Sequence, residues 1–209
     1  MKKINPKAVT DYNRTDAELQ KFWLFCIIVA GKNADWASEK VEMLLADMPD
    51  FMKPFGYLRS INVLDKLQEI KTGQYNRISR AINESVGLDL RTAAPAQLEA
   101  VHGVSHKTSR FFVIHTRKHI EDVAALDTHL LGYLDWLGFA DIPKGSVSNS
   151  KRYTRLEWIF VQVKRLLFPD DTMAEADLKI WMTMSGRSYE PLPTITQDEM
   201  DSILGGLEA

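Results

Sequence analysis

The sequence contains one cysteine, Cys26, among its 209 residues. A disulfide within the chain is therefore excluded, and so is a metal cluster that needs four cysteine ligands. Long apolar runs are also missing, because the longest, residues 22–31, has only about half the length of a membrane-spanning helix. The basic start at Lys2 and Lys3 is not followed by the apolar segment of a secretory signal. These absences predict a globular, cytoplasmic protein without a membrane partner.

A net positive charge, typical of nucleic-acid-binding proteins, is missing too, since the formal net charge is −2. The negative charge comes from residues 169–209, which hold nine acidic and two basic residues. Residues 1–168 hold 24 basic and 19 acidic residues, a net charge of +5. Basic residues concentrate at 102–119 and 144–165. Such clusters favour a basic nucleic-acid-binding surface, although ordinary solvated helix faces show the same pattern.

Strand-like alternation, internal repeats and low-complexity segments are absent, whereas helix signals are frequent. Capping boxes run from Thr15 to Glu18 and from Thr196 to Glu199. Residues 58–71 have apolar side chains at helical spacing. The sequence therefore predicts an all-α fold. The expected helices cover residues 15–30, 35–48, 58–71, 76–86, 95–101, a segment that begins near 107, 127–137, 151–167, 173–184 and 196–204.

The stretch from 98 to 129 concentrates the functional signals. The short helix predicted at residues 95–101 ends at a turn around Gly103 and Ser105, and a second helix starts at once with Lys107 in its first turn. The first amide N–H groups of a helix have no acceptor within it, and the helix dipole favours an anion there. A backbone phosphate fits such a site. We expect the turn to hold nucleic acid without reading its sequence.

This stretch resembles the hairpin of the helix-hairpin-helix DNA glycosylases, the superfamily of endonuclease III and 8-oxoguanine DNA glycosylase. Residues 98–108 are similar to the family's LPGVGxKT motif, and residues 126–129, Leu-Asp-Thr-His, are similar to its VDTH motif. Residues 73–77 resemble the start of a family helix, G-x-Y-N-x-K-A. The family's hairpin lysine falls on Lys107, and its catalytic aspartate falls on Asp127.

The resemblance implies a two-lobed helix-hairpin-helix fold with a cleft between the lobes that binds double-stranded DNA. Residues 21–125 would form a helical barrel lobe with the hairpin, and residues 1–20 together with 126–209 would form the second lobe. A monomer is expected. The sequence departs from the family at His102, where the family usually has proline, and at Ser105, where it has a second glycine.

Lys107 and Asp127 have the side chains that cleavage of an N-glycosidic bond requires. A carboxylate stabilises the positive charge that develops on the sugar and can accept a proton from the nucleophile. A deprotonated lysine amine can displace the base and hold the sugar as a Schiff base, and elimination of the 3′ phosphate then gives lyase activity. The alternatives are a solvent-facing phosphate contact for Lys107 and a plain helix N-cap for Asp127, which is compatible with catalysis.

Further site residues follow from the family pattern and from proximity to the hairpin. Phe111 lies one turn after Lys107, so its ring could stack on a base flipped out of the duplex, and packing in the core is an equal alternative. In this family, the end of the first long helix supplies the wedge residue that fills the space left in the duplex by the flipped base. The expected phosphate contacts are Gly103, Ser105, Thr108 and Arg110, and the expected base-pocket or wedge residues are Lys32, Asn33, Phe111 and Trp181.

Histidines recur at a spacing of four, His102 with His106 and His115 with His119, and the second pair would share a helical face as metal ligands often do. A zinc site is one interpretation of these pairs. The other is that the histidines face phosphate or solvent, which the surrounding Lys and Arg residues favour. We expect no metal site and no cofactor. The lone Cys26 excludes the iron-sulfur cluster of some relatives, while the resemblance allows a monovalent cation at the hairpin.

The predicted function is that of a DNA glycosylase with apurinic/apyrimidinic (AP) lyase activity in base excision repair. The Lys-plus-Asp pair and the missing cluster cysteines look most like the small 8-oxoguanine glycosylases of archaea and bacterial viruses. One alternative is an enzyme of the same fold that modifies bases of viral DNA, for instance an altered thymine, without excision. The other is a non-catalytic DNA-binding module.

Overall fold

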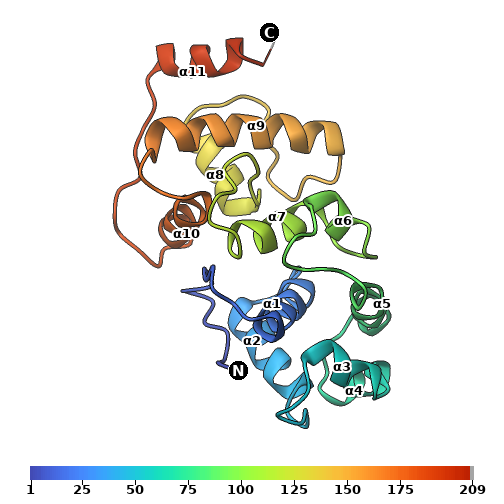
Figure 1. The fold of residues 1–209 in the computed structure, drawn as a ribbon. Coiled ribbons are helices and arrows are strands. Elements are labelled where there is room, and N and C mark those ends of the chain that lie inside the picture. The colour runs from blue at the N-terminus through green and yellow to red at the C-terminus, as the bar shows by residue number, and fades with distance from the viewer. Residues whose placement is uncertain (208–209) are drawn as a thin grey trace. The chain divides into compact units, whose positions relative to one another are not determined.

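The computed structural model describes residues 1–207, and over that range it consists of helices and connecting segments without a β-strand (Figure 1). The predicted all-α fold is confirmed. None of these helices combines the length and apolar character needed to cross a membrane. The helices are α1 (Asp16–Ile28), α2 (Ala34–Leu44), α3 (Pro54–Arg59), α4 (Val63–Glu69), α5 (Tyr75–Ser85), α6 (Pro95–Glu99), α7 (His106–Ile114), α8 (Thr128–Trp136), α9 (Ser150–Leu167), α10 (Met173–Met184) and α11 (Gln197–Gly205).

Helix ends follow the local signals that the sequence carries. Both predicted capping boxes form: Thr15 Oγ1 accepts from the Glu18 amide at 3.4 Å, and Thr196 Oγ1 accepts from the Glu199 amide at 3.3 Å. α1 ends before Gly31, which has φ = +71°. A glycine adopts this left-handed conformation without steric cost, so the chain can leave the helix there.

The helix predicted over residues 58–71 is interrupted, and this prediction was wrong. α3 ends early, and α4 starts after Asn62, whose Oδ1 accepts from the amides of Leu64 and Asp65 at 3.1 and 3.4 Å. An asparagine side chain competes with the helical backbone for these donors and so begins a new helix. The apolar spacing did not reveal this internal cap.

The chain divides into two compact units, residues 1–116 and the residues from 117 onward. In the first unit, the buried Lys21 donates from Nζ to the carbonyl of Lys2 at 2.9 Å. This bond fixes the N-terminal segment to α1. The structure thus groups residues 1–20 with the hairpin unit, which differs from the expected grouping with the C-terminal helices.

α1 forms the centre of the first unit, since every residue from 21 to 28 is buried. It packs against α2, α3, α5 and α7. Trp23 donates from Nε1 to Ser85 Oγ at 2.7 Å, and its ring meets that of Phe112 edge-on, with 5.0 Å between centroids. A helix that is apolar all round can anchor neighbours on every side. One buried helix therefore holds both α5, whose Arg77 bonds to the hairpin turn, and α7, which follows the turn.

In the second unit, α8 packs against α10, and α9 packs against α11. Tyr133 of α8 is fully buried, and its Oη donates to the carbonyl of Pro193 at 2.7 Å. Burial raises the pKa of Tyr133, so the hydroxyl remains a donor. This bond ties the segment after α10 to α8.

Candidate nucleic-acid interface and catalytic residues

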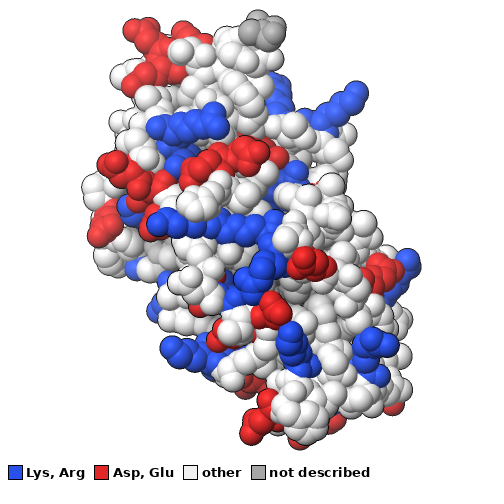
Figure 2. Space-filling model, viewed as in Figure 1, with Lys and Arg blue, Asp and Glu red and all other residues white. Residues whose placement is uncertain are grey.

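The basic cluster at residues 144–165 lies partly on the exposed side of α9, where these residues are exposed: Lys151, Arg152, Arg155 and Arg165. The acidic Glu157 is buried, and so is Lys164, which pairs with Glu121 at 2.6 Å. Acidic side chains gather instead over α11 (Figure 2), where Asp198 and Asp201 are exposed. An exposed basic helix face supports the predicted phosphate-binding surface in this unit.

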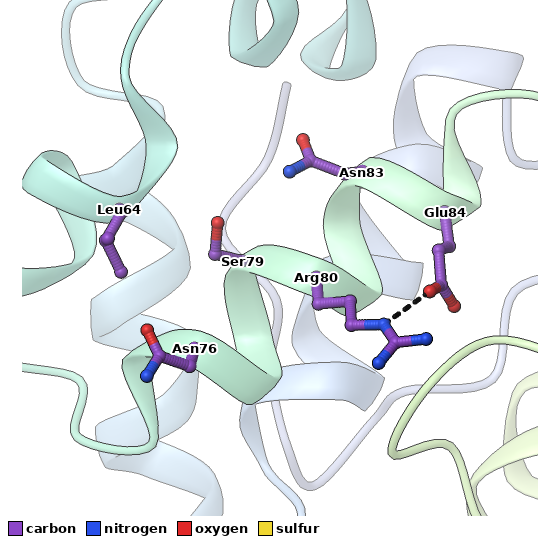
Figure 3. A pocket seen from close by; sticks show the side chains of 6 residues that line it. All are labelled: Leu64, Asn76, Ser79, Arg80, Asn83 and Glu84. Atoms are coloured by element: carbon purple, nitrogen blue, oxygen red, sulfur yellow. Dashed lines mark hydrogen bonds and ion pairs between the residues drawn. The ribbon is translucent and has the colours of Figure 1, made fainter.

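An open depression of 440 Å³ lies between α4 and α5 (Figure 3) and contains none of the predicted site residues. Glu84 lines it together with Arg80, which donates from Nε to Glu84 Oε1 at 2.7 Å. Glu84 Oε2 accepts from the His102 amide at 2.6 Å. The bond from Arg80, and after it that from His102, holds the pKa of Glu84 below its ordinary value. This carboxylate therefore supports the hairpin at the position where the family has proline.

The hairpin turn between α6 and α7 depends on a glycine. Gly103 has φ = +73°, and a Cβ there would lie 2.6 Å from Arg77 Cγ. Arg77 donates from Nη1 to the Gly103 carbonyl at 3.2 Å and from Nη2 to the Ile27 carbonyl at 3.0 Å. The predicted turn forms, and Arg77 ties it to α1. The guanidinium occupies this carbonyl, and the monovalent cation that the resemblance allowed stays a prediction.

Ser105 is the N-cap of α7 and has an ordinary extended backbone, with φ = −93° and ψ = 167°. Its Oγ accepts from the Thr108 amide at 3.3 Å and lies 3.1 Å from Thr108 Oγ1. Thr108 is buried and bonded to this cap, which differs from its predicted contact with phosphate. The amide of Lys107 remains in the first turn, where a helix offers no acceptor. Serine thus replaces the family's glycine here without strain.

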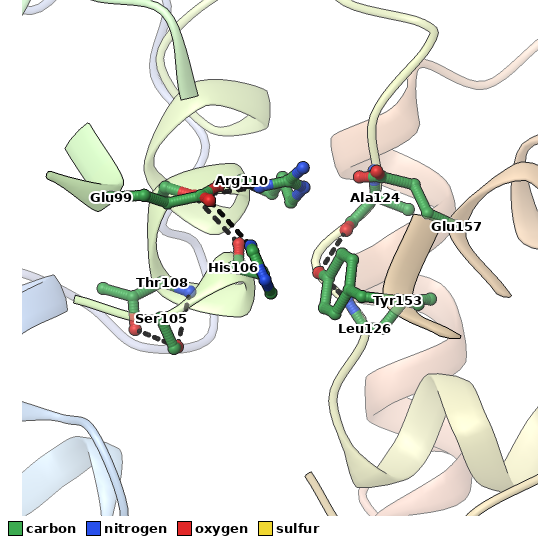
Figure 4. Close-up of polar contacts among 10 residues, drawn as sticks. Glu99, Ser105, His106, Thr108, Arg110, Ala124, Leu126, Tyr153 and Glu157 are labelled. Carbon is green, nitrogen blue, oxygen red and sulfur yellow. Dashed lines mark hydrogen bonds and ion pairs between the residues drawn. The ribbon is translucent and has the colours of Figure 1, made fainter. Parts of the chain in front are cut away.

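Glu99, on α6, accepts from three side chains of α7 (Figure 4). Its Oε2 lies 2.7 Å from His106 Nδ1, and its Oε1 accepts from Ser109 Oγ at 2.9 Å. Arg110 Nη1 donates to Oε1 and forms an ion pair with it. We call these four residues the hairpin clamp. Because the Arg110 side chain is only 14% exposed and is paired with Glu99, its role differs from the predicted phosphate contact.

Lys107 is half-buried, and its ammonium makes no ion pair or hydrogen bond with another described residue. Its Nζ lies 5.0 Å from the centroid of the Phe111 ring. That ring also packs 6.0 Å from the Phe22 ring and 4.4 Å from the His115 ring, so it belongs partly to the core. The amine therefore covers one face of the Phe111 ring. Burial raises the pKa of the nearby Cys26, so this thiol is a poor competing nucleophile.

The two wedge candidates, Lys32 and Asn33, lie exposed between α1 and α2. Asn33 Oδ1 accepts from the amides of Asp35 and Trp36 at 2.9 and 3.1 Å, so this side chain caps α2. Lys32 Nζ lies 5.8 Å from the Trp36 ring centroid and would lie 3.9 Å from a Cβ at Gly73. The structure thus brings Lys32 to Gly73, the start of the motif at residues 73–77, while Asn33 has a local structural role.

Asp127 is the N-cap of α8. Its Oδ1 accepts from the amides of His129 and Leu130 at 2.8 and 3.0 Å, while Oδ2 has no hydrogen-bond partner among residues 1–207. The backbone before it is fixed by α9, whose Tyr153 accepts from the amide of Leu126 through Oη at 3.1 Å (Figure 4). The cap therefore orients the carboxylate and leaves one oxygen available.

Trp181, near the end of α10, lies beside the start of α8. Its ring is 6.5 Å from the His129 ring at an interplanar angle of 89°, and Arg187 Cζ lies 4.5 Å from its centroid. His129 also donates its amide to Asp127, so the candidate acid and Trp181 share one end of the α8–α10 pair. We call His129, Trp181 and Arg187 the tryptophan platform.

The predicted site residues divide between the two units. Asp127 and Trp181 belong to the second unit, and the first unit carries Lys32, Asn33, Gly103, Ser105, Lys107, Thr108, Arg110 and Phe111. Sequence reasoning missed Glu99, Arg77 and Arg187. Arg77 stands inside the motif at residues 73–77 and could have been noticed there. The other two have no sequence signal, because their roles depend on partners that packing brings to them.

The predicted histidine pairs do not behave as ligand pairs. α7 ends at Ile114, so His115 and His119 share no helical face, contrary to the prediction. His115 is buried with its Nδ1 2.8 Å from Thr10 Oγ1, and His106 belongs to the hairpin clamp. In the part of the chain that the structure describes, no three His, Cys, Asp or Glu side chains are grouped so that they could hold a metal ion.

Known protein families, curated proteins and solved structures give no match to this chain. The likeness to the glycosylases is therefore carried by three short motifs, at residues 73–77, 98–108 and 126–129.

Proposed function

We propose that the protein is a DNA glycosylase with AP lyase activity, built on the helix-hairpin-helix glycosylase fold. In this proposal the two units are its lobes, and the cleft between them binds double-stranded DNA. The protein acts as a monomer and needs no cofactor. Its substrate class is an oxidised purine such as 8-oxoguanine, as the resemblance implies.

The observation that carries the proposal is the environment of Lys107. It follows a glycine turn at the start of a helix, is half-buried, and has no acid on its ammonium among the described residues. The neighbouring Arg110, in contrast, is paired with Glu99. A lysine at a helix N-terminus that is not paired with a carboxylate can act on a bound substrate and can lie next to a phosphate. Asp127, with one unpaired carboxylate oxygen, supplies the second group that the reaction requires.

In the proposed mechanism, the neutral amine of Lys107 attacks C1′ of a flipped nucleotide while the bond from C1′ to the base breaks. The base leaves with the electron pair of that bond and takes a proton from water. Asp127 stabilises the positive charge on the sugar and accepts the proton that the amine loses. Opening of the sugar ring gives a Schiff base, and loss of a C2′ proton then breaks the bond from C3′ to its phosphate oxygen. Water releases the lysine from the cleaved strand.

Borohydride trapping tests this function. The full-length protein is incubated with duplexes that carry 8-oxoguanine, uracil, thymine glycol, hydroxymethyluracil or an abasic site. We expect a covalent protein–DNA adduct that disappears in Lys107→Gln and forms about a hundredfold or more slowly in Asp127→Asn. Lys118→Gln, which removes an exposed lysine from the same basic stretch, is the matched control and should leave trapping unchanged.

The other outcomes contradict the proposal in distinguishable ways. Intact strands with mass added to a base would identify a base-modifying enzyme. Binding without any change in the DNA would identify a non-catalytic module. An adduct that persists in Lys107→Gln would place the nucleophile elsewhere.

A further inference from the structure

The acidic C-terminal segment, residues 169–207, contains two basic side chains, and they are treated differently. Lys179 pairs with Asp171 at 2.7 Å. The Arg187 guanidinium is exposed and makes no ion pair or hydrogen bond with another described residue, although Glu190 lies three residues after it. It is held instead by the face of Trp181, 4.5 Å from the ring centroid. Stacking fixes a guanidinium but leaves its N–H donors accessible to solvent or to a ligand.

The backbone under Arg187 is fixed as well. α10 ends at Met184, Gly186 follows with φ = +71°, and the Arg187 amide donates to the Met182 carbonyl at 2.8 Å. Thr183 Oγ1 donates to the Glu190 carbonyl at 3.2 Å. These bonds form a helix C-cap and close the following loop onto α10. Arg187 therefore starts from a defined position, which lowers the entropy that a bound ligand would have to remove.

A ligand at this site must be compatible with aromatic side chains and with the charged N–H donors of the Arg187 guanidinium. Trp181 is half-buried, His129 meets it edge-on, and Tyr189, two residues beyond Arg187, is 98% exposed. A flat ring can stack on an aromatic face that the guanidinium leaves uncovered, and the guanidinium donates strongly to carbonyl oxygens. A nucleobase that carries a carbonyl combines both properties.

We propose that the tryptophan platform binds a nucleobase and that Arg187 selects bases with a carbonyl oxygen on the edge it faces. The inference rests on the proposed function, because the base would be the one whose sugar lies at Asp127. Guanine, 8-oxoguanine, hypoxanthine and uracil carry such an oxygen. Adenine has none and presents an amino group, which is itself a donor and cannot accept from the guanidinium. Arg187 is thus a specificity-determining residue, separate from the residues that break the bond.

Binding, measured by fluorescence anisotropy in a Lys107→Gln background, tests the role of Arg187 without chemistry. Two duplexes carry hypoxanthine or adenine at one position, each opposite an abasic-site analogue so that pairing strength does not differ. A third duplex carries the abasic analogue in both strands. We expect hypoxanthine to bind about tenfold to a hundredfold more tightly than adenine. Arg187→Gln should reduce this ratio to about one, and Arg187→Lys should retain part of it. Lys179→Gln removes the other basic side chain of residues 169–207, which is paired with Asp171, and should leave the ratio unchanged.

Three results would overturn the inference. The protein could show no preference for hypoxanthine, or Arg187→Gln could keep the preference. The variant could also weaken all three duplexes equally and lower the salt dependence of binding, as the loss of a phosphate contact does. Borohydride trapping reports separately on the proposed function. If the adduct forms but Arg187→Gln keeps the hypoxanthine-to-adenine affinity ratio, only the role of Arg187 is contradicted. If Arg187→Gln abolishes the ratio but no adduct forms, only the proposed glycosylase activity is contradicted.

Discussion

The hairpin clamp and the tryptophan platform each hold an arginine, but by opposite means. In the clamp, Arg110 is mostly buried and its charge is paired with Glu99. On the platform, Arg187 is exposed and is held by an aromatic face without a carboxylate. The first arrangement uses charge to fasten two helices. The second leaves charge available to a ligand. The position of an arginine in a motif therefore does not show whether it can bind a ligand. What decides this is whether a carboxylate lies close enough to pair with it.

The largest stability difference should separate these two regions. Glu99→Ala removes the acceptor of three α7 side chains and leaves the little-exposed Arg110 without its carboxylate, so we expect a loss of about 2–4 kcal/mol in the free energy of unfolding. Arg187→Gln removes an exposed charge and should cost less than about 0.5 kcal/mol. Urea titration of both variants measures the difference. Equal losses would contradict the distinction between a fastening and an available arginine.

A smaller effect is expected at the turn. Gly103→Ala adds a Cβ that would meet Arg77 Cγ at 2.6 Å and forces a left-handed φ on alanine, which should cost about 1–3 kcal/mol. Repeating the substitution in an Arg77→Ala background removes the clash and leaves the backbone strain, so the cost should shrink. Gly87→Ala, where nothing lies within 4 Å of the added Cβ, is the control and should be close to neutral. An unchanged cost in both backgrounds would mean that Arg77 does not confine the turn.

The smallest effect concerns pH, and here the two units should agree. Glu18 of α1 and Glu175 of α10 accept first from the backbone amides of Thr15 and Thr172, which lowers the pKa of each carboxyl below the ordinary 4.5. A lowered folded-state pKa contributes stability that is present above pH 4.5 and is lost as the pH falls through the folded value. Glu18→Gln and Glu175→Gln should each flatten the decline of stability below about pH 4.5, by a few tenths of a kcal/mol. Unequal flattening in thermal unfolding would show that one cap is not formed in solution.

Some features of the fold could be predicted because their causes are local. The capping boxes at Thr15 and Thr196, the turn at Gly103 and the cap at Asp127 each depend on residues within a few positions of one another. The internal cap at Asn62 was also local, but the apolar periodicity concealed it. Sequence reasoning failed where a role depends on distant partners. For Arg110 the sequence predicted a phosphate contact, whereas the structure shows an ion pair with Glu99.

By itself, the sequence determined most of the helices, their main start and stop signals, and the position of Lys107 and Asp127 at helix starts, because capping and φ preferences act over a single turn. The tertiary structure alone decided which charged side chains form ion pairs and which remain available to a ligand. Arg110 pairs with Glu99, whereas Arg187 stacks on Trp181. The physical reason is that ion pairing and stacking require contact between side chains from separate helices, and packing of the core sets which helices meet.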